Sequence, residues 1–291
     1  MELRSDVILT PPRDAATVVL LRDAPRGLEV FLVKRHGLSD VLGGAYVFPG
    51  GKLDTSDAQL AEHIHLDQTS GALHAALGEP EVPLDHAKGL YVAALREAFE
   101  ESGVLFADTA DAGQTQQAMQ LMRDGLPFNQ ILAQLSLRLS TRVLAPWSRW
   151  ITPKMASVST KRFDTRFFVA AIPHAQVARH DDFETTESVW LSPRAALEQY
   201  WARDIELAPP QIMSLAHLAR HNAVDTVMSE ARSKRPPLVC PEPHDANGER
   251  VLCYPGDARH SVMQRALPGP TRLIYRNRRF EPTEGFEALF Q

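Results

Sequence analysis

The residues best suited to chemistry form two short segments. The first is the turn Phe48-Pro49-Gly50-Gly51, which follows a short apolar run. The second is the acidic segment Arg96-Glu97-Ala98-Phe99-Glu100-Glu101-Ser102-Gly103-Val104. Glycines let a backbone or a ligand approach closely, and clustered carboxylates are the hard oxygen ligands that Mg²⁺ and Mn²⁺ prefer. Together the two segments predict a divalent-metal site that acts on phosphate groups.

The carboxylates are predicted to project from a helix. An apolar stripe at helical spacing is formed by Leu90, Ala94, Leu95, Ala98 and Phe99. Glu97, Glu100 and Glu101 lie on another face, where like charges repel each other by roughly 0.2–0.5 kcal/mol per pair. A bound cation would remove that conflict. We expect Asp85 to cap the helix at its N-terminus and Gly103 to end it.

The ordinary alternative is a solvated helix face in which Arg96 and Glu100 form an ion pair. The neighbouring glycine turn favours the functional interpretation, because carboxylates for a metal and bare backbone for phosphates then occur together. Histidines at positions 63, 65, 74 and 86 fit no established zinc spacing. They are interpreted as solvated residues.

The acidic segment resembles the second half of the Nudix box of Nudix hydrolases, with Gly51 as the opening glycine. In that family a glutamate stands six residues after the glycine and eight residues before the arginine. Here the first count reaches Asp57 and the second reaches Lys88, because about thirty extra residues intervene. The resemblance therefore leaves the equivalent of that outer glutamate open.

Two further segments narrow the resemblance. Ser148–Pro153 and Arg162–Phe168 look like the coenzyme A diphosphatase branch, in the form with a long insertion inside its box. This implies an α/β/α sandwich with a mixed sheet, and hydrolysis of CoA or acyl-CoA to 3′,5′-ADP and (acyl-)4′-phosphopantetheine. The alternatives are a pyrophosphatase for ADP-ribose, NADH or dinucleoside polyphosphates, and a non-catalytic nucleotide-binding homologue.

The resemblance also implies roles for individual residues. Glu97 and Glu101 are expected to be the principal ligands of Mg²⁺ or Mn²⁺, with Glu100 shared between roles. The carbonyl of Gly50 or Gly51 is expected to be a further ligand, and Arg96 is expected to orient the carboxylates.

Other residues are candidates for the base and for substrate binding. Nudix enzymes often supply the general base from outside the box, which makes Glu184 and Glu187 candidates for that role. For binding the substrate, the candidates are Gly50, Gly51, Arg35 and Arg162.

Composition limits the class of protein. The chain has 291 residues, a net charge of −5 and 44% hydrophobic residues, which fits a globular protein and argues against nucleic-acid binding. Its apolar runs are too short to span a membrane. Two cysteines, Cys240 and Cys253, fit a reducing cytoplasm better than a secreted disulfide framework. The expected partner is a small-molecule nucleotide.

The chain order indicates an α/β or α+β protein. A hairpin is predicted over 15–35 and a strand over 104–106. The catalytic domain is assigned to 13–205, and 206–291 is a C-terminal extension whose last residues, 287–291, resemble a tag remnant. Insertions at 55–87 and 108–140 are predicted to be helical, with short helices at 58–65 and 71–77 in the first. They could wall an apolar groove, form a homodimer interface or thicken the core.

Overall fold

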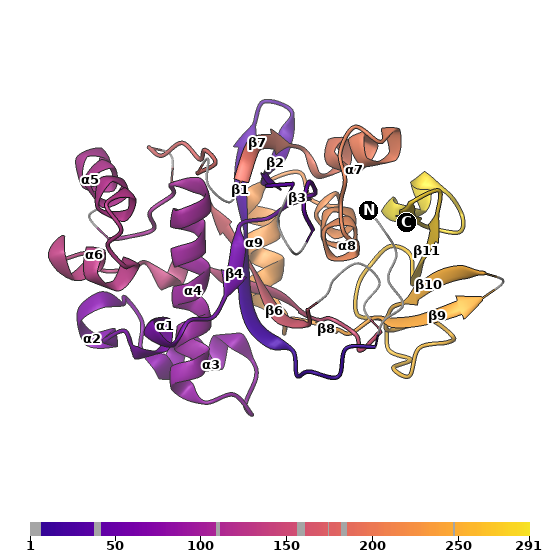
Figure 1. Cartoon of the computed structure of the whole chain (residues 1–291), viewed down its shortest axis with the longest axis horizontal. Helices are drawn as coiled ribbons and strands as arrows, with labels where there is room; N and C mark the ends of the chain where they lie inside the picture. Colours follow the sequence, from indigo (N-terminus) through magenta and orange to yellow (C-terminus); the bar gives the residue numbers. More distant parts are fainter. Residues whose placement is uncertain are drawn as a thin grey trace.

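The computed structural model describes residues 7–37, 42–108, 111–155, 161–173, 175–181, 185–246 and 248–291. A mixed β-sheet forms the centre, with helices on both of its faces (Figure 1). Over these residues the strand order is β3-β2-β1-β6-β5-β8, and β4 and β7 pair with β1 and β2. The predicted α/β/α sandwich with a mixed sheet is confirmed.

The strands of this sheet come from most of the chain. They are β1 (Arg13–Ala24), β2 (Gly27–Arg35), β3 (Tyr46–Val47), β4 (Gly50–Lys52), β5 (Ala145–Ile151), β6 (Phe163–Ala171), β7 (Thr185–Leu191) and β8 (Leu238–Val239). The predicted hairpin is formed by β1 and β2, whose ends pair at Ala24 and Gly27. On its other side β1 pairs with β6 in parallel.

Strand β1 is buried on both faces, because its side chains alternate between two cores. Val18 and Leu20 join the core beneath α4 (Leu84–Ser102), while Val19 and Leu21 join the core on the opposite face. That second core is covered by three helices, α7 (Pro193–Ala202), α8 (Pro209–Leu218) and α9 (Val224–Ser233). The period of two in a strand explains this division.

Helix α4 carries the acidic segment, as the apolar stripe predicted. Its C-terminus is also as predicted, because Gly103 has φ 69° and donates its backbone N–H to the carbonyl of Phe99 at 2.8 Å. The predicted cap at Asp85 is wrong. The helix begins at Leu84, with Pro83 as its N-cap. Asp85 lies in the first turn, where its carboxylate interacts favourably with the helix dipole.

The strand predicted over 104–106 is absent, although its three side chains are buried in the α4-side core. The backbone of Leu105 is paired by a side chain in place of a neighbouring strand. Its N–H donates to Gln176 Oε1 at 2.8 Å, and its carbonyl accepts from Gln176 Nε2 at 2.7 Å. A side-chain amide can satisfy both backbone groups of one residue, and hydropathy alone does not reveal this.

The first insertion contains three short helices, α1 (Thr55–Gln59), α2 (Glu62–His65) and α3 (Ser70–Leu77). A break at Leu60 and Ala61 divides the single helix predicted over 58–65, whereas α3 is confirmed. The second insertion contains the predicted helical pair, α5 (Ala112–Arg123) and α6 (Phe128–Gln134), followed by the 3₁₀ turn η1 (Thr141–Val143). Both insertions lie at one end of the molecule, around α4 (Figure 1).

The insertions thicken the core on the α4 side. Leu73 and Leu77 of α3 and Ile131 and Leu132 of α6 are buried in the same cluster as α4. Backbone hydrogen bonds join the two insertions, since Leu139 donates to the carbonyl of His65 at 2.7 Å. The homodimer alternative stays a prediction.

The C-terminal residues contribute to the sandwich and then form a small sheet of their own. This sheet has the order β12-β11-β10-β9 and lies at the end of the molecule opposite the insertions (Figure 1). Its elements are β9 (Glu242–Ala246), β10 (Glu249–Cys253), β11 (Arg272–Arg276) and β12 (Arg279–Glu281), followed by the 3₁₀ turn η2 (Phe286–Phe290). Leu273 and Phe280 pack into the core that α8 and α9 share with the central sheet. The predicted domain boundary at 205 stays a prediction.

Candidate active site

Arg96 lies at the centre of the acidic cluster and is 7% exposed. Its Nε and Nη2 donate to the carboxylate of Asp57 at 2.9 and 3.0 Å, and Nη2 also donates to the carbonyl of Lys52 at 2.9 Å. Its Nη1 donates to Glu97 at 2.7 Å and to Glu100 at 2.9 Å. A guanidinium has five N–H donors, and these hydrogen bonds to protein groups use all of them. This geometry makes Arg96 an organiser of carboxylates.

Burial alone would lower the pKa of Arg96. The hydrogen bonds to Asp57 and the charges of Glu97 and Glu100 outweigh burial and raise it. The guanidinium is therefore a permanent positive charge, and it holds two helix carboxylates and one insertion carboxylate in fixed positions.

The sequence offered two positions for the outer acid, Asp57 and Lys88, and Asp57 is the one that contacts Arg96. It lies on α1, six residues after Gly51, and is 3% exposed against the guanidinium of Arg96. The other candidate position, Lys88, instead pairs with Asp85 at 3.0 Å within the first half of α4. Of the two counted positions, Asp57 is the one that contacts Arg96, and most of the long insertion lies between α1 and α4.

Gly50 and Gly51 are required by close contacts on both sides of β4. A Cβ at Gly50 would lie 2.7 Å from the carbonyl oxygen of Ala16 on β1, and one at Gly51 would overlap the carboxylate of Glu97. The N–H of Gly50 donates to Glu101 Oε2 at 2.9 Å. The two glycines thus bring β4 directly against the carboxylates of α4.

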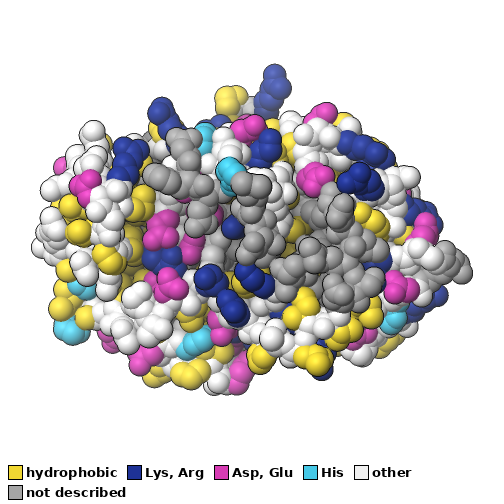
Figure 2. All heavy atoms as spheres, viewed as in Figure 1, with side chains coloured by type: hydrophobic (Ala, Val, Ile, Leu, Met, Phe, Trp, Pro, Cys, Tyr) yellow, Lys and Arg dark blue, Asp and Glu magenta, His cyan; other side chains and the backbone are white. Residues whose placement is uncertain are grey.

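Among the described residues of the cluster, carboxylates outnumber the one guanidinium. One guanidinium faces the carboxylates of Asp54, Asp57, Glu97 and Glu100. Burial is the main cause that raises the pKa of Glu100, and the charges of Asp57 and Asp54 raise it further against the opposing charge of Arg96. On the face over α4 and β4, acidic side chains gather with basic side chains beside them (Figure 2). Hard carboxylate oxygens in this excess fit a divalent cation such as Mg²⁺ or Mn²⁺.

Glu187 lies on β7 and is held by residues of two neighbouring strands. It accepts a hydrogen bond from the hydroxyl of Tyr46 at 2.5 Å and pairs with Lys34 at 3.2 Å. These contacts, with that of Tyr46 the largest, lower the pKa of Glu187, while burial and Glu187 raise the pKa of Tyr46 to about 12. The other candidate base, Glu184, lies outside the described residues. No local pattern indicated a role for Tyr46, because its partner is 141 residues away.

The two arginines predicted to bind substrate lie in different places. Arg35 is the half-buried last residue of β2 and pairs in register with Thr185 of β7. Arg162 donates to the carbonyls of Thr152 at 2.9 Å and Thr10 at 3.2 Å. It directly precedes the first residue of β6, which pairs with Arg13. That position is about 13 Å along the sheet from the level of Gly50. The structure therefore gathers Arg96, the three helix glutamates and both glycines, and places Arg162 apart.

Comparison with known proteins assigns the chain to a family. A profile of the NUDT19 Nudix domain matches residues 63–218, which is more than half of the chain. The chain belongs to this Nudix family. The matched residues include the whole of α4, whereas the glycine turn and Asp57 precede them.

Similar proteins carry the same family name. "Putative nudix hydrolase 7" of Caenorhabditis elegans is 26% identical over 279 residues, which are 94% of this chain and 82% of that protein. The acyl-coenzyme A diphosphatases NUDT19 of Xenopus laevis and Homo sapiens are each 27% identical, over 65% and 66% of this chain. Those matches span 59% and 61% of the two relatives, so the chain covers less than two thirds of their length.

A solved structure supports the fold as well. A Nudix hydrolase from Alicyclobacillus acidocaldarius superposes with a TM-score of 0.61 and is 27% identical. The match covers 76% of this chain and 97% of that one. The assignments to the Nudix hydrolases and to the Nudix diphosphatase class of enzyme are thereby confirmed.

Family membership also bears on cofactor and partner. Nudix hydrolases generally use divalent metal ions and act on small-molecule nucleotides, and the charge excess of the α4 cluster accords with such a metal. Across the described ranges, no helix is long and apolar enough to cross a membrane.

Proposed function

We propose that this Nudix protein is a Mg²⁺- or Mn²⁺-dependent diphosphatase that hydrolyses CoA or acyl-CoA to 3′,5′-ADP and (acyl-)4′-phosphopantetheine. The observation that carries the chemistry is the set of α4 carboxylates held against Gly50 and Gly51 by Arg96. The printed function of the frog and human relatives supports the choice of substrate.

The proposed metal ligands are Glu97, Glu101, Glu100 and the carbonyl of Gly50. Glu97 and Glu101 lie one helical turn apart, and each is in contact with one residue of the glycine pair. In a strand the N–H and C=O of one residue project to the same side. Because the N–H of Gly50 donates to Glu101, we expect its carbonyl to face the same carboxylates.

The protein's part in the reaction is to hold these groups in place. Arg96 fixes Glu97 and Glu100 through one nitrogen, and the Gly50 amide fixes Glu101. A metal bound there supplies a positive charge for the diphosphate and lowers the pKa of its bound water. The site is preorganised, since these hydrogen bonds exist before any substrate arrives.

For the general base we propose Glu184 as the first residue to test, ahead of Glu187. Hydrogen bonds from Tyr46 and Lys34 lower the pKa of Glu187 and occupy both of its oxygens, which weakens it as a proton acceptor. If Glu184 is the base, Glu184→Gln lowers kcat most at neutral pH and recovers at high pH. If Glu187→Gln shows that profile instead, the base is Glu187.

A substrate panel with saturating Mg²⁺ tests the substrate proposal. It comprises CoA, acetyl-CoA, dephospho-CoA, ADP-ribose, NADH and diadenosine tetraphosphate, each measured as kcat/KM. We expect CoA or acetyl-CoA to exceed ADP-ribose by at least about tenfold, or about 1.4 kcal/mol of transition-state binding. A kcat/KM for ADP-ribose that equals the CoA value rejects the CoA assignment and leaves the diphosphatase chemistry intact.

We also propose a reducing, cytoplasmic setting. Both cysteines are free. Burial raises the pKa of Cys240, and it raises the pKa of Cys253 to about 11, so neither thiol is reactive at neutral pH. Localisation of the tagged full chain by microscopy tests this proposal directly.

A further inference from the structure

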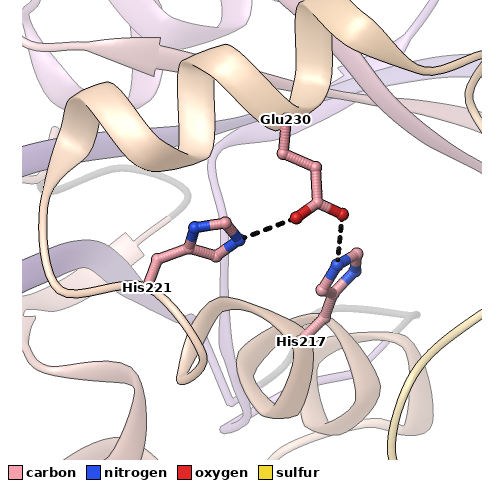
Figure 3. A group of neighbouring side chains, drawn as sticks. All are labelled: His217, His221 and Glu230. Carbon is pink, nitrogen blue, oxygen red and sulfur yellow. Dashed lines mark hydrogen bonds and ion pairs between the residues drawn. The ribbon is translucent and has the colours of Figure 1, made fainter.

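A second cluster of ligand-type side chains lies on the face of the sheet opposite α4. His217 is in the last turn of α8, His221 follows in the turn after that helix, and Glu230 is on α9. Figure 3 shows the carboxylate of Glu230 reaching down between the two imidazole rings. His221 and Glu230 lie beyond the last residue of the Nudix family match, so family membership does not account for the cluster.

The three side chains converge closely. His217 Nε2 lies 3.0 Å from Glu230 Oε1, and His221 Nε2 lies 3.2 Å from Glu230 Oε2 (Figure 3). One ligand atom from each residue lies within 4.8 Å of the other two. The two histidine side chains are 10% and 9% exposed, and that of Glu230 is 24% exposed. The cluster is therefore buried on its histidine side and open to solvent on its carboxylate side.

The hydrogen bonds around His221 determine which ring nitrogen carries the proton. The hydroxyl of Thr226 donates to the carbonyl of Ala223 at 2.7 Å, so its oxygen accepts from His221 Nδ1 at 3.1 Å. In the neutral ring this places the proton on Nδ1 and leaves a lone pair on Nε2. That lone pair is buried, lacks a hydrogen-bond partner and is aimed at a carboxylate oxygen. Two acceptors facing each other at 3.2 Å repel, and a proton or a metal ion between them would relieve that repulsion.

Packing holds the ring of His217 with its Nε2 toward Glu230. Its ring lies against Trp147, with ring centroids 4.4 Å apart, and its Nδ1 is buried without a hydrogen-bond partner. Its Nε2 lies at hydrogen-bond distance from the Glu230 carboxylate, 3.0 Å away, which favours the ring proton on Nε2 in the metal-free protein. A cation that displaces this proton would gain Nε2 as a ligand, because metal binding releases protons from its ligands.

We propose that His217, His221 and Glu230 bind one divalent cation of the zinc class, which ties α8 to α9. Two imidazole nitrogens and one carboxylate are a recognised zinc donor set, and nitrogen and oxygen ligands of such an ion lie about 2.0–2.2 Å from it. Thr226 holds His221 in the ligating tautomer, as a second-shell partner does in metal sites. The open side of Glu230 leaves room for a water as the fourth ligand.

Other charged groups also face Glu230. Lys234 Nζ lies 3.1 Å from Glu230 Oε1, and its side chain is 68% exposed. Before a cation binds, this ammonium compensates the carboxylate. An exposed lysine side chain can turn away at small cost, since an exposed ion pair is worth about 0–1 kcal/mol. A purely polar cluster of the two histidines, Glu230 and Lys234 is the competing arrangement, and the experiments below discriminate the two.

Zinc binding to the purified full chain tests the proposal. After removal of metals with EDTA and dialysis, Zn²⁺ is titrated in the presence of excess Mg²⁺, which keeps the oxygen-rich α4 site occupied. We expect one equivalent of Zn²⁺ by calorimetry and by elemental analysis. Zinc at about 100 times its Kd should raise Tm by about 5 °C. Co²⁺ in the same site should give the intense visible absorption of a nitrogen-ligated four-coordinate ion.

Two variants and a matched control localise the ion. His221→Gln and Glu230→Gln should each weaken Zn²⁺ binding by about 100-fold or more and abolish the Tm shift. His86→Gln is the control, because His86 also pairs with a carboxylate, Asp14, at 3.2 Å but belongs to no group of three ligands in the described chain. It should retain the wild-type equivalent. Circular dichroism without metal verifies that each variant is folded.

A gain of affinity gives a test that misfolding cannot imitate. Lys234→Met removes the competing ammonium, so we expect the Kd for Zn²⁺ to fall by about threefold to tenfold. Unchanged binding in Lys234→Met together with undiminished binding in His221→Gln overturns the proposal. Absence of a bound equivalent in the wild-type chain overturns it as well and assigns the residues to a polar cluster.

Discussion

Two buried clusters of arginine and carboxylates differ in their balance of charge. The α4 cluster sets Arg96 against Asp57, Glu97 and Glu100, with Glu101 beside them on the Gly50 amide. The second, which we call the β6 cluster, consists of Arg149, Arg166, Glu79 and Asp164. Both lie on the same face of one domain and use the same chemical groups.

In the β6 cluster two arginines face two buried acids, Glu79 and Asp164. Two more exposed acids, Asp14 and Glu81, pair with the same arginines at the edge of the cluster. Glu79 Oε2 lies 2.8 Å from Arg149 and 2.7 Å from Arg166, and Asp164 accepts two hydrogen bonds from Arg149 at 2.9 and 2.7 Å. Two arginines thus neutralise two buried acids, which stabilises the docking of the first insertion on β5 and β6. Among the described residues of the α4 cluster, the acids outnumber the one arginine by a larger margin. A bound divalent cation would offset that excess.

The largest expected effect is a loss of kcat/KM on substitution in the α4 cluster. Glu101→Gln keeps the shape of the side chain and removes a proposed metal ligand, so kcat/KM should fall by about 10³-fold. Thermal stability should be retained, because one like-charge contact is removed with the ligand. Glu198→Gln, on the exposed face of α7, is the matched control and should leave turnover unchanged. Near-wild-type turnover of Glu101→Gln at saturating Mg²⁺ would remove this residue from the metal site.

A substitution in the β6 cluster should lower stability and leave catalysis unchanged. Glu79→Gln removes one of the two acids that Arg149 and Arg166 share, the other being Asp164, so the free energy of unfolding should fall by about 3 kcal/mol. Urea denaturation measures this loss, and the fraction that remains folded should keep wild-type turnover. Glu81→Gln is the control, because Glu81 pairs with Arg149 but is 62% exposed and should leave stability close to that of the wild type. Equal losses in both variants would contradict the charge-balance argument.

Asp57 links the insertion to catalysis, which predicts an intermediate effect. Asp57→Asn keeps one acceptor for Arg96 but removes the charge, so kcat/KM should fall by about 10- to 100-fold. Asp57→Glu, which restores the family's glutamate, should recover part of that loss. Lys88→Met should leave kcat/KM unchanged. If Lys88→Met had the larger effect, the outer acid would have been misassigned.

The smallest effect is the pH dependence contributed by Glu100. Burial raises its pKa above the ordinary 4.5, so its contribution to stability is full below that pH and is lost as pH rises through the folded-state pKa. Without metal, Tm should therefore decline by about 1–3 °C between about pH 5 and 7 because of this group. Mg²⁺ should reverse the decline, and Glu100→Gln should abolish it. A Tm that is independent of Mg²⁺ across this range would contradict the prediction.

Local sequence patterns specified much of the α4 site. The apolar stripe of α4 and the left-handed residue Gly103 are features of one segment, and they located Glu97, Glu100 and Glu101 correctly on the helix. The β1–β2 hairpin was predicted for the same reason.

Such local patterns could not predict contacts between segments that are distant in sequence. Asp57 and Lys88 were equal by counting, and only the folded chain shows which of them reaches Arg96. The predicted strand at Leu105 failed because Gln176, 71 residues away, satisfies its backbone. His217 and Glu230 meet only when α8 packs beside α9, so their spacing in sequence carried no recognisable metal signal.

The split of the box between Asp57 and Arg96 has a consequence for chain entropy. These residues are 39 positions apart here, whereas the family places the equivalent pair eight apart. Loop-closure entropy grows only as (3/2)RT ln n, so the longer connection disfavours their meeting by about 1.4 kcal/mol. Burial of a single leucine contributes about 1.5–3 kcal/mol, and the inserted segment buries both Leu73 and Leu77 beside α4. A catalytic motif can therefore accept a long interruption when the inserted segment brings core residues of its own.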